Sequence, residues 1–432
     1  MSPRAFHLPA APARVARARF GEAELETAVL EASDVGELVG RLALPAGDAR
    51  TRAAAVARAA RRFGDPADPL RRLAEEWLPP TTGFSRAMIA ETVPGIFAPL
   101  EAEALARAVG AARGFFVASL AIVTAGNVPG VAVAKTALAL TAGVPSLVKT
   151  ASGEPLLSVL FAQAVAEADA RLGESHAALW WEGARGDLAS TLGASVASLV
   201  AYGSDEAIAA LRTIAPPLFV AHGHRSSVAA VRLDGGAEPS AIAAAVARDV
   251  ALYDQQGCLS PQALFAIGGS EAALGALVEE LARSLADLAT RLPRGRMSDG
   301  EHVTIRRFRD AAEWRVIRGE GVILRHDPGG TAWTLLVDPT PALRANPLGR
   351  TLVVHPIGSA AELAGAVGGH PGRIESLGIA PWPDDELAVL ATELGIPRVV
   401  RVGEMQTPGL DWRQGGLDPL AGIVAAEEAR AP

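Results

Sequence analysis

Cys258 is the only cysteine among the 432 residues, and it lies in the segment DQQGCLSPQ. A lone cysteine cannot form an intrachain disulfide, and it excludes a metal site that needs two thiolates from one chain. It is therefore either a buried, inert thiol or a nucleophile. Gly257 removes side-chain bulk beside it, and Gln255 and Gln256 stand where an inert core cysteine usually has aliphatic neighbours. These neighbours favour the nucleophile.

Three other segments combine polar residues with glycine: TAGNVPG (124–130), VKTASGEP (148–155) and AYGSDEAI (201–208). Each follows an apolar run, and ligands bind beyond the carboxyl ends of parallel strands. We therefore expect a binding site there. The chain has no GxGxxG string after any expected strand, which argues against a standard Rossmann dehydrogenase.

The residues around these segments alternate between apolar runs and helical patterns. Strands are expected at 115–123, 146–149, 177–181, 198–202 and 217–220, and helices at 131–140, 155–172 and 205–213. Near-continuous apolar strands that alternate with helices are typical of a parallel, doubly wound sheet. Such a sheet carries the three segments at its strand ends.

A second unit begins near residue 227. The pattern predicts a strand at 228–233, a helix at 239–253, the Cys258 turn, a strand at 263–267, a helix at 271–291 and mixed strands such as 321–324 and 331–337. We therefore predict an α/β protein with a helical N-terminal segment (1–90), two doubly wound parallel-sheet domains (91–225 and 226–402) and a C-terminal tail (403–432). The active site is expected in the cleft between the domains.

The composition excludes some classes of function. Lys+Arg 40 against Asp+Glu 48 gives a net charge of −8, so there is no overall bias toward nucleic acid. The most apolar stretch, 115–148, is interrupted by Asn127, Pro129, Lys135 and Pro145, which favours a buried strand–helix–strand unit over a membrane span. No secretory signal is evident at the N-terminus, and with one cysteine the cytoplasm is the default compartment.

The strings GNVP, VKTASGEP and QQGCLSPQ together resemble a known family. The chain is similar to the aldehyde dehydrogenase superfamily and, within it, to the LuxC-type acyl-CoA reductases, typified by the reductase of bacterial luminescence. The resemblance covers roughly residues 90 to 420, in the expected order and spacing, and fits the N-terminal 90 residues only loosely. It implies an aldehyde-dehydrogenase-like fold with a cofactor domain and a catalytic domain.

The resemblance assigns catalytic roles to two residues. Cys258 matches the nucleophile, with Gln256 at the position of the glutamine two residues before it. Asn127 matches the asparagine whose amide helps to bind the oxyanion, a role suited to an N–H group aimed at developing negative charge. From its type alone, Asn127 is equally suited to capping a turn beside Pro129.

The resemblance also implies an NADP(H) site. Lys149 matches the lysine that contacts the adenosine ribose, and Gly203-Ser204 match the pair that opens a helix beneath the pyrophosphate. Ser152 stands where many NAD-preferring relatives have a carboxylate, so a 2′-phosphate meets no repulsion there. The alternatives are an ordinary strand-end lysine at Lys149 and a simple helix start at Ser204.

Two departures from the family pattern carry information. Hydrolytic aldehyde dehydrogenases have a glutamate that activates water, and its position here falls on Ala221 in the string AHGHRS. Without that base a thioacyl enzyme is not readily hydrolysed, which suits acyl exchange with CoA. A second glutamate, which orients the nicotinamide ribose, falls on Asn346, so that contact is in doubt.

His222 and His224 form an HxH pair. On a strand they would share one face, as metal ligands can, but no third ligand is evident nearby, so we predict no metal site. One of them is a candidate proton donor for the product alkoxide or the CoA thiolate, a hypothesis that rests on placement alone.

The resemblance implies an enzyme that reduces a medium- to long-chain acyl-CoA to the aldehyde. The Cys258 thiolate attacks the thioester, CoA leaves, and hydride from NADPH gives a thiohemiacetal that collapses to aldehyde. A homo-oligomer is expected, assembled through the tail, and an acyl-activating or acyl-transferring protein is a candidate partner. Two alternatives stay open: a CoA-acylating aldehyde dehydrogenase acting on a short aldehyde, and a catalytically silent acyl carrier or scaffold.

Overall fold

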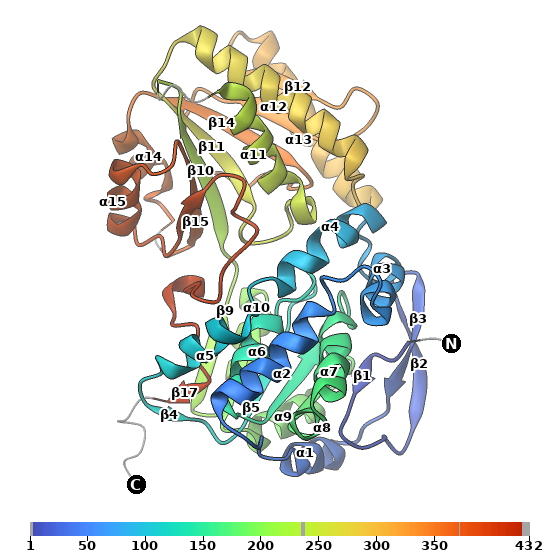
Figure 1. The fold of residues 1–432 in the computed structure, drawn as a ribbon. Helices are drawn as coiled ribbons and strands as arrows, with labels where there is room; N and C mark the ends of the chain where they lie inside the picture. The colour runs from blue at the N-terminus through green and yellow to red at the C-terminus, as the bar shows by residue number, and fades with distance from the viewer. Residues whose placement is uncertain (1–2, 235–237, 371, 426–432) are drawn as a thin grey trace. The chain divides into compact units, whose positions relative to one another are not determined.

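The computed structural model describes residues 3–234, 238–370 and 372–425. The chain forms two compact units. The first contains the chain through His224 together with Gly409–Trp412 and the segment from Leu417 onward, and the second contains Arg225–Pro408 and Arg413–Gly416. Each unit is built on a mainly parallel sheet with helices on it (Figure 1). The predicted fold class is therefore confirmed.

A six-stranded sheet forms the centre of the first unit. Its order is β1 (Phe6–His7), β7 (His176–Trp180), β6 (Ser146–Thr150), β5 (Leu120–Val123), β8 (Ser198–Tyr202) and β9 (Leu218–His222). Neighbouring strands run parallel except for β1 and β7. Because β5 lies between β6 and β8, the strand order reverses there, and ligands bind beyond the carboxyl ends of strands at such a reversal.

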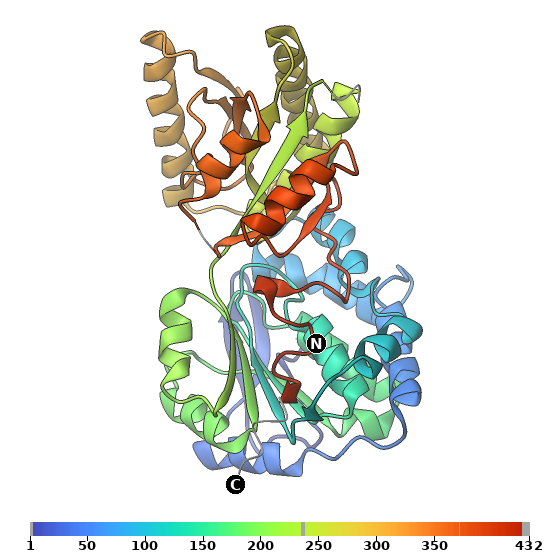
Figure 2. The same ribbon diagram turned by 90° about the vertical axis from the view of Figure 1, so that its left-hand side faces the viewer.

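Helices cover both faces of this sheet (Figure 2). They are α1 (Ala32–Arg41), α2 (Ala49–Arg61), α3 (Pro69–Thr82), α4 (Arg86–Phe97), α5 (Ala102–Gly110), α6 (Val133–Ala142), α7 (Leu157–Ala168), α8 (Ala170–Gly173), α9 (Gly186–Ser195) and α10 (Asp205–Arg212). Val35 of α1 and Leu192 of α9 pack with the buried strand residues Leu147 and Leu199 in one apolar cluster. No helix in the described part of the chain is long and apolar enough to cross a membrane.

The N-terminal segment departs from the predicted all-helical structure. β1 joins the central sheet, and β2 (Val15–Phe20) and β3 (Ala23–Ala28) form an antiparallel hairpin. The sequence of β2, VARARF, alternates with period two, which is a strand pattern. Its arginines face carboxylates on β3, as in the 3.2 Å contact between Arg17 Nη1 and Glu24 Oε1. The prediction of a helical segment was therefore wrong for residues 15–28, which form two strands.

The second unit has a seven-stranded sheet. Its order is β12 (Ile323–His326), β13 (Thr334–Val337), β14 (Thr351–Ile357), β11 (Pro261–Ile267), β10 (Ser226–Arg232), β15 (Ile374–Ala380) and β16 (Val399–Arg401), in which only β12 runs antiparallel to its neighbour. The helices are α11 (Pro239–Ala251), η1 (Leu252–Gln255), α12 (Glu271–Arg291), α13 (Asp299–Ile317), α14 (Ala360–Val367), α15 (Asp385–Glu393) and η2 (Gln414–Gly416).

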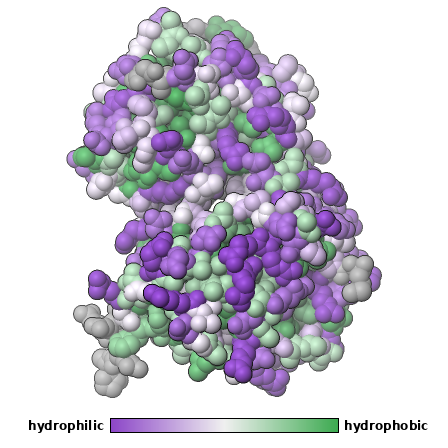
Figure 3. Space-filling view, viewed as in Figure 1, coloured by the Kyte–Doolittle hydropathy of each residue, from purple (hydrophilic) through white to green (hydrophobic). Residues whose placement is uncertain are grey.

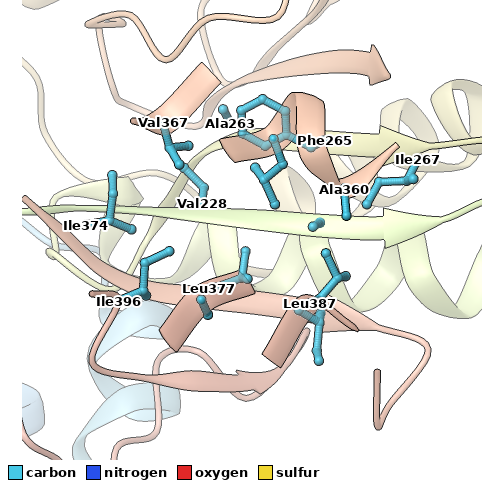
Figure 4. Packing of buried hydrophobic residues seen from close by; sticks show 14 of the residues in the cluster. Val228, Ala263, Phe265, Ile267, Ala360, Val367, Ile374, Leu377, Leu387 and Ile396 are labelled. Carbon is cyan, nitrogen blue, oxygen red and sulfur yellow. The ribbon is translucent and has the colours of Figure 1, made fainter. Parts of the chain in front are cut away.

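An apolar core fixes the central strands of the second unit. Val228 of β10, Phe265 of β11 and Leu377 of β15 pack with Val367 of α14 and Leu387 of α15 (Figure 4). Burying one such side chain stabilises the fold by about 1.5–3 kcal/mol. Outside the core, the visible face of each unit mixes hydrophilic and apolar residues (Figure 3). The core therefore holds β10, β11 and β15 in place.

The C-terminal tail packs on the first unit over part of its length. β17 (Val424–Ala425) pairs with β4 (Phe115–Phe116), so the single strand predicted at 115–123 is split into β4 and β5. Lys135 Nζ donates to the carbonyl oxygens of Pro419 and Ala421 at 2.6 and 2.9 Å. The role of the tail in oligomerisation stays a prediction.

Candidate active site

Cys258 lies in the loop between η1 and β11 of the second unit. The three residues of η1 before it, Tyr253, Asp254 and Gln255, have φ angles of 54°, 51° and 65°. This left-handed conformation costs about 1–2 kcal/mol for each L residue, so the loop needs strong partners. One of them is Ser227, whose Oγ donates to the carbonyl oxygen of Cys258 at 2.7 Å.

The carboxylate of Asp254 anchors the left-handed stretch. It accepts hydrogen bonds from Arg350 Nε and from the backbone N–H of Gly295, both at 2.9 Å. Arg350 is fully buried and also donates to the carbonyl oxygen of Leu292 at 2.7 Å. Because a buried charge is stable only with a close counter-charge and hydrogen bonds, this pair fixes the loop to the protein interior.

The side-chain amide of Gln255 anchors the same stretch to two strands. Its Nε2 donates to the carbonyl oxygens of Pro261 and Thr351 at 2.9 and 2.7 Å, and its Oε1 accepts from the N–H of Thr351 at 2.8 Å. Gln255, which from the sequence indicated a polar environment around Cys258, is thus buried and has a structural role. Gln256, by contrast, is exposed.

Cys258 is a partly exposed residue, and its thiol is protonated at neutral pH. Burial, and after it the charge of Glu375, raise the pKa of Cys258 to about 12, whereas Arg225 and Arg398 act in the opposite direction. Sequence reasoning missed all three charged residues, because they come from distant segments. One signal was available, since Glu375 is a carboxylate inside the apolar strand IESLGIA.

Asn127, the predicted oxyanion residue, and several residues predicted to bind the cofactor lie at one edge of the first unit's sheet. Asn127 follows β5, Lys149 lies near the end of β6, and Gly203-Ser204 follow β8. In the register, Val123 of β5 lies beside both Lys149 and Ala201. These are the strands at which the order reverses, so the predicted positions meet where a ligand would bind. The side chain of Asn127 is exposed.

The two loops at this edge pack backbone to backbone. A Cβ added to Gly153 would lie 2.4 Å from the carbonyl oxygen of Gly126, so only glycine allows the approach. The N–H of Ala151 donates to Thr124 Oγ1 at 3.1 Å. The close contact holds segment 124–130, which carries Asn127, against the loop that follows β6.

Lys149 has the properties expected for a residue that contacts an anion. Burial lowers its pKa to about 8, and its ammonium makes no hydrogen bond or ion pair with any of the described residues. A desolvated cation without a counter-charge gains stability when an anion binds beside it. Lys149 therefore suits an anionic ligand, and its role in binding a cofactor stays a prediction.

The hydroxyl oxygens of Ser152 and Ser204 each already accept a hydrogen bond within the protein. Ser152 Oγ accepts from Trp180 Nε1 at 3.0 Å. Ser204 is the N-cap of α10, and its Oγ accepts from the N–H of Ala207 at 3.3 Å. Unpaired N–H groups at a helix start favour a phosphate, whereas Asp205 and Glu206 in the first turn of α10 oppose one. The phosphate role of this helix start stays a prediction.

A comparison with protein families decides the relationship. The model of the family described as Acyl-CoA reductase (LuxC) matches residues 116–426. The chain belongs to this family. The resemblance drawn from the strings around Cys258, Lys149 and Asn127 is therefore confirmed.

The chain also resembles curated proteins that are named long-chain acyl-protein thioester reductases. The chain is 26% identical over 310 residues to the long-chain acyl-protein thioester reductase 2 of Photobacterium leiognathi, a match that covers 69% of this chain and 61% of that protein. It is 26% identical over 316 residues to the long-chain acyl-protein thioester reductase of Aliivibrio fischeri, with the same shares. The chain thus spans about three fifths of the length of these relatives.

Solved structures show the same fold. Aldehyde dehydrogenase 21 from Physcomitrella patens, in complex with succinate, superposes with a TM-score of 0.75 at 13% identity and covers 97% of this chain and 93% of its own. A benzaldehyde dehydrogenase from Corynebacterium glutamicum gives a TM-score of 0.69 at 17% identity, with 92% and 93% covered. At these identities the likeness establishes the aldehyde-dehydrogenase-like fold alone.

Two positions depart from the pattern that the resemblance gives for hydrolytic aldehyde dehydrogenases. Ala221 lies on β9 in register with Ala201 of β8, so no ionisable group stands at the expected position of the base. The amide of Asn346 donates to the carbonyl oxygens of Gln262 and Thr351 at 3.0 and 3.2 Å and accepts from the N–H of Leu348 at 2.9 Å. Asn346 is thus engaged in holding its own loop.

The two histidines do not share a strand face as predicted. β9 ends at His222, which is buried and stacked on Tyr202 with ring centroids 4.8 Å apart, whereas His224 lies beyond the strand and is exposed. No group of three or more His, Cys, Asp or Glu residues that could hold a metal ion occurs within the described ranges. The proton-donor role of either histidine stays a prediction.

Proposed function

We propose that the protein reduces an acyl thioester to the aldehyde through a thioacyl intermediate on Cys258, with acyl-CoA as the acyl donor and NADPH as the reductant. The observation that carries the proposal is the Cys258 loop. The sole cysteine of the chain stands partly exposed on a strained loop that buried side chains hold in one conformation. The names of the curated relatives support the same reaction class.

The chemistry at Cys258 begins with loss of the thiol proton. The thiolate attacks the thioester carbonyl, the carbon–sulfur bond to the donor breaks, and the departing thiolate takes up a proton. Negative charge that develops on the carbonyl oxygen is stabilised by N–H donors aimed at it. The family resemblance assigns this role to the amide of Asn127 and the backbone N–H of Cys258.

The acyl group is kept for reduction because water is a poor competitor. General-base activation of water needs a titratable side chain within hydrogen-bond reach, and the family's position for that base is Ala221 in this chain. A thioacyl enzyme without a base persists until another reactant removes the acyl group.

Lys149, Ser152, Gly203 and Ser204 would hold the dinucleotide. Lys149 offers an unpaired, desolvated ammonium, and Ser152 adds no negative charge beside it, which favours a ligand with a 2′-phosphate. When bound, NADPH supplies the hydride that converts the thioacyl group to the oxidation level of the aldehyde.

The proposal is tested by exposing the protein to acyl-CoAs of increasing chain length and measuring its intact mass. We expect one acyl adduct per chain, fastest with medium to long chains, and aldehyde once NADPH is added. Cys258→Ser should form no thioester and no aldehyde. NADPH-dependent aldehyde production by Cys258→Ser contradicts the proposal, and an adduct on the unaltered protein that NADPH never reduces identifies an acyl carrier instead.

A second acyl donor is favoured by the relatives, whose names specify acyl-protein thioesters. The same acyl group should therefore be offered once on CoA and once as a thioester on a protein, at equal concentration. The donor that acylates Cys258 with the higher second-order rate constant is the substrate of the enzyme.

A further inference from the structure

Glu375 is a carboxyl group inside the core of the second unit. Every residue of its strand, β15, is buried, and its own side chain is 0% exposed. An ionised carboxylate out of contact with water is stable only when hydrogen bonds and counter-charges replace its hydration. The surroundings of Glu375 therefore decide whether it carries a charge.

The partners of Glu375 favour its ionised form. Arg225 Nε lies 3.5 Å from Glu375 Oε2, and the N–H of Gly415 donates to both carboxylate oxygens at 3.0 and 3.1 Å. Arg225 Nη2 donates in turn to the carbonyl oxygen of Gly415 at 3.3 Å. Gly415 has φ 64°, and a Cβ there would lie 3.0 Å from this guanidinium. The cluster formed by these three residues leaves no room for a side chain at position 415.

The sheet register brings this anion next to the cysteine loop. Ser226 and Ser227 of β10 lie opposite Ile374 and Ser376, so Glu375 is the extra residue of a bulge on β15. Ser227 is also the residue whose hydroxyl holds the carbonyl oxygen of Cys258. Ser227, which holds the Cys258 loop, therefore lies beside the bulge that contains Glu375.

We infer that Glu375, held in its charged form by Arg225 and Gly415, is a positioning residue that controls the ionisation of Cys258. Its negative charge opposes formation of a second negative charge on the sulfur, because like charges in a poorly hydrated site repel strongly. The nucleophile is thus kept as a protonated thiol until an acyl donor is attacked.

Two cations act against Glu375 at the cysteine. Arg225 forms an ion pair with the Glu375 carboxylate. Arg398 donates hydrogen bonds to Ser376 Oγ and to the carbonyl oxygen of Met405, at 3.3 and 2.8 Å. Both lower the pKa of Cys258, but burial and Glu375 outweigh them. Without the carboxylate of Glu375, the two arginines should therefore lower the pKa of Cys258 further.

The inference is tested by the rate at which iodoacetamide alkylates Cys258 as a function of pH. Glu375→Gln keeps the shape and removes the charge, so we expect the midpoint of the profile to move down by about one pH unit. Below both midpoints the thiolate fraction then rises about tenfold, while the lower basicity of the sulfur reduces its reactivity about threefold. A net acceleration of about threefold at pH 8 is the expected result.

Three matched variants make the result specific. Glu375→Asp keeps the charge and should keep the high midpoint, and Glu386→Gln removes an exposed carboxylate of the same unit and should change nothing. An unshifted or raised midpoint in Glu375→Gln overturns the inference. So does an equal shift in Glu375→Gln and Glu375→Asp, which would indicate a change of packing instead of charge.

The catalytic consequence rests on the proposed function, but the alkylation test does not. If thioester reduction fails while the midpoint shifts, the control of Cys258 by Glu375 stands and the proposed function falls. If both hold, acylation of Cys258 by the acyl donor at pH 7 should be faster in Glu375→Gln, by a factor similar to that of alkylation.

Discussion

At the scale of single residues, Lys149 makes the cofactor proposal testable. It is one of only two lysines in the chain, and its ammonium is desolvated without a partner in the described residues. A charge-assisted hydrogen bond contributes about 1.5–3 kcal/mol, so Lys149→Met should weaken NADPH binding about 10- to 100-fold. The affinity for NADH, which lacks the 2′-phosphate, should fall by a smaller factor. Titration of cofactor fluorescence measures both affinities.

The pH dependence of binding checks the same residue independently. Since the pKa of Lys149 is about 8 in the free protein, NADPH affinity should be constant below pH 8 and fall above it as the ammonium is lost. Acetic anhydride at pH 8 should label Lys149, and NADPH should protect it while leaving the labelling of Lys135 unchanged. Equal losses of NADPH and NADH affinity in Lys149→Met, or labelling that NADPH does not alter, contradict the assignment.

At the scale of elements, the left-handed residues of η1 depend on the buried pair of Asp254 and Arg350. Asp254→Asn keeps a residue that tolerates this backbone conformation but leaves the Arg350 guanidinium buried without its counter-charge. Breaking such a pair on one side costs about 3–5 kcal/mol. Urea unfolding should show this loss for the transition of the second unit.

The matched control is an exposed ion pair of the same unit. Asp287→Asn breaks the contact with Arg291 on α12, where both side chains are largely solvated, and should cost under about 0.5 kcal/mol. In Asp254→Asn/Arg350→Met the destabilisation should largely disappear, because no unpaired charge remains. A double variant as unstable as Asp254→Asn would show that the backbone conformation, and not the charge, needs the pair.

The elements themselves were predictable where burial dictates their sequence. The bounds of β8 and α12 match the expected 198–202 and 271–291, because an apolar run or a strong helical period is a local signal. α13 was missed because its apolar residues do not gather on one face of the helix. The helix expected at 155–172 is broken between α7 and α8 by extended backbone at Asp169.

The candidate site was predictable to the same extent. Cys258, Lys149 and Ser204 stand in local strings with recognisable types. Glu375 and Arg225 become neighbours only through the pairing of β10 with β15, which joins segments about 150 residues apart. Contacts between distant segments leave little trace in a single sequence, so the electrostatic surroundings of the cysteine required the structure.

At the scale of the whole molecule, the C-terminal tail is an integral part of the first unit. Ile423 and Leu420 are buried there, β17 pairs with β4, and a Cβ on Gly422 would lie 2.5 Å from Val200 Cγ2. Lys135 is the polar centre of this attachment, since its buried amino group donates to two tail carbonyls. The tail is therefore held against β4, α6 and β8 of the first unit.

This attachment predicts a pH-dependent stability. Burial lowers the pKa of Lys135 from 10.5 to about 8, so between these values the unfolded chain binds a proton that the folded chain does not. The free energy of unfolding should consequently rise with pH across that window, by at most about 3 kcal/mol, and be unaffected by this residue below pH 8. Lys135→Met and Lys135→Arg, which do not titrate there, should both lack the increment. Urea unfolding from pH 7.5 to 10.5 measures it as the difference between wild type and variant, which cancels the titration of Lys149 and the tyrosines. Parallel curves for wild type and both variants would show that folding does not lower the pKa of Lys135.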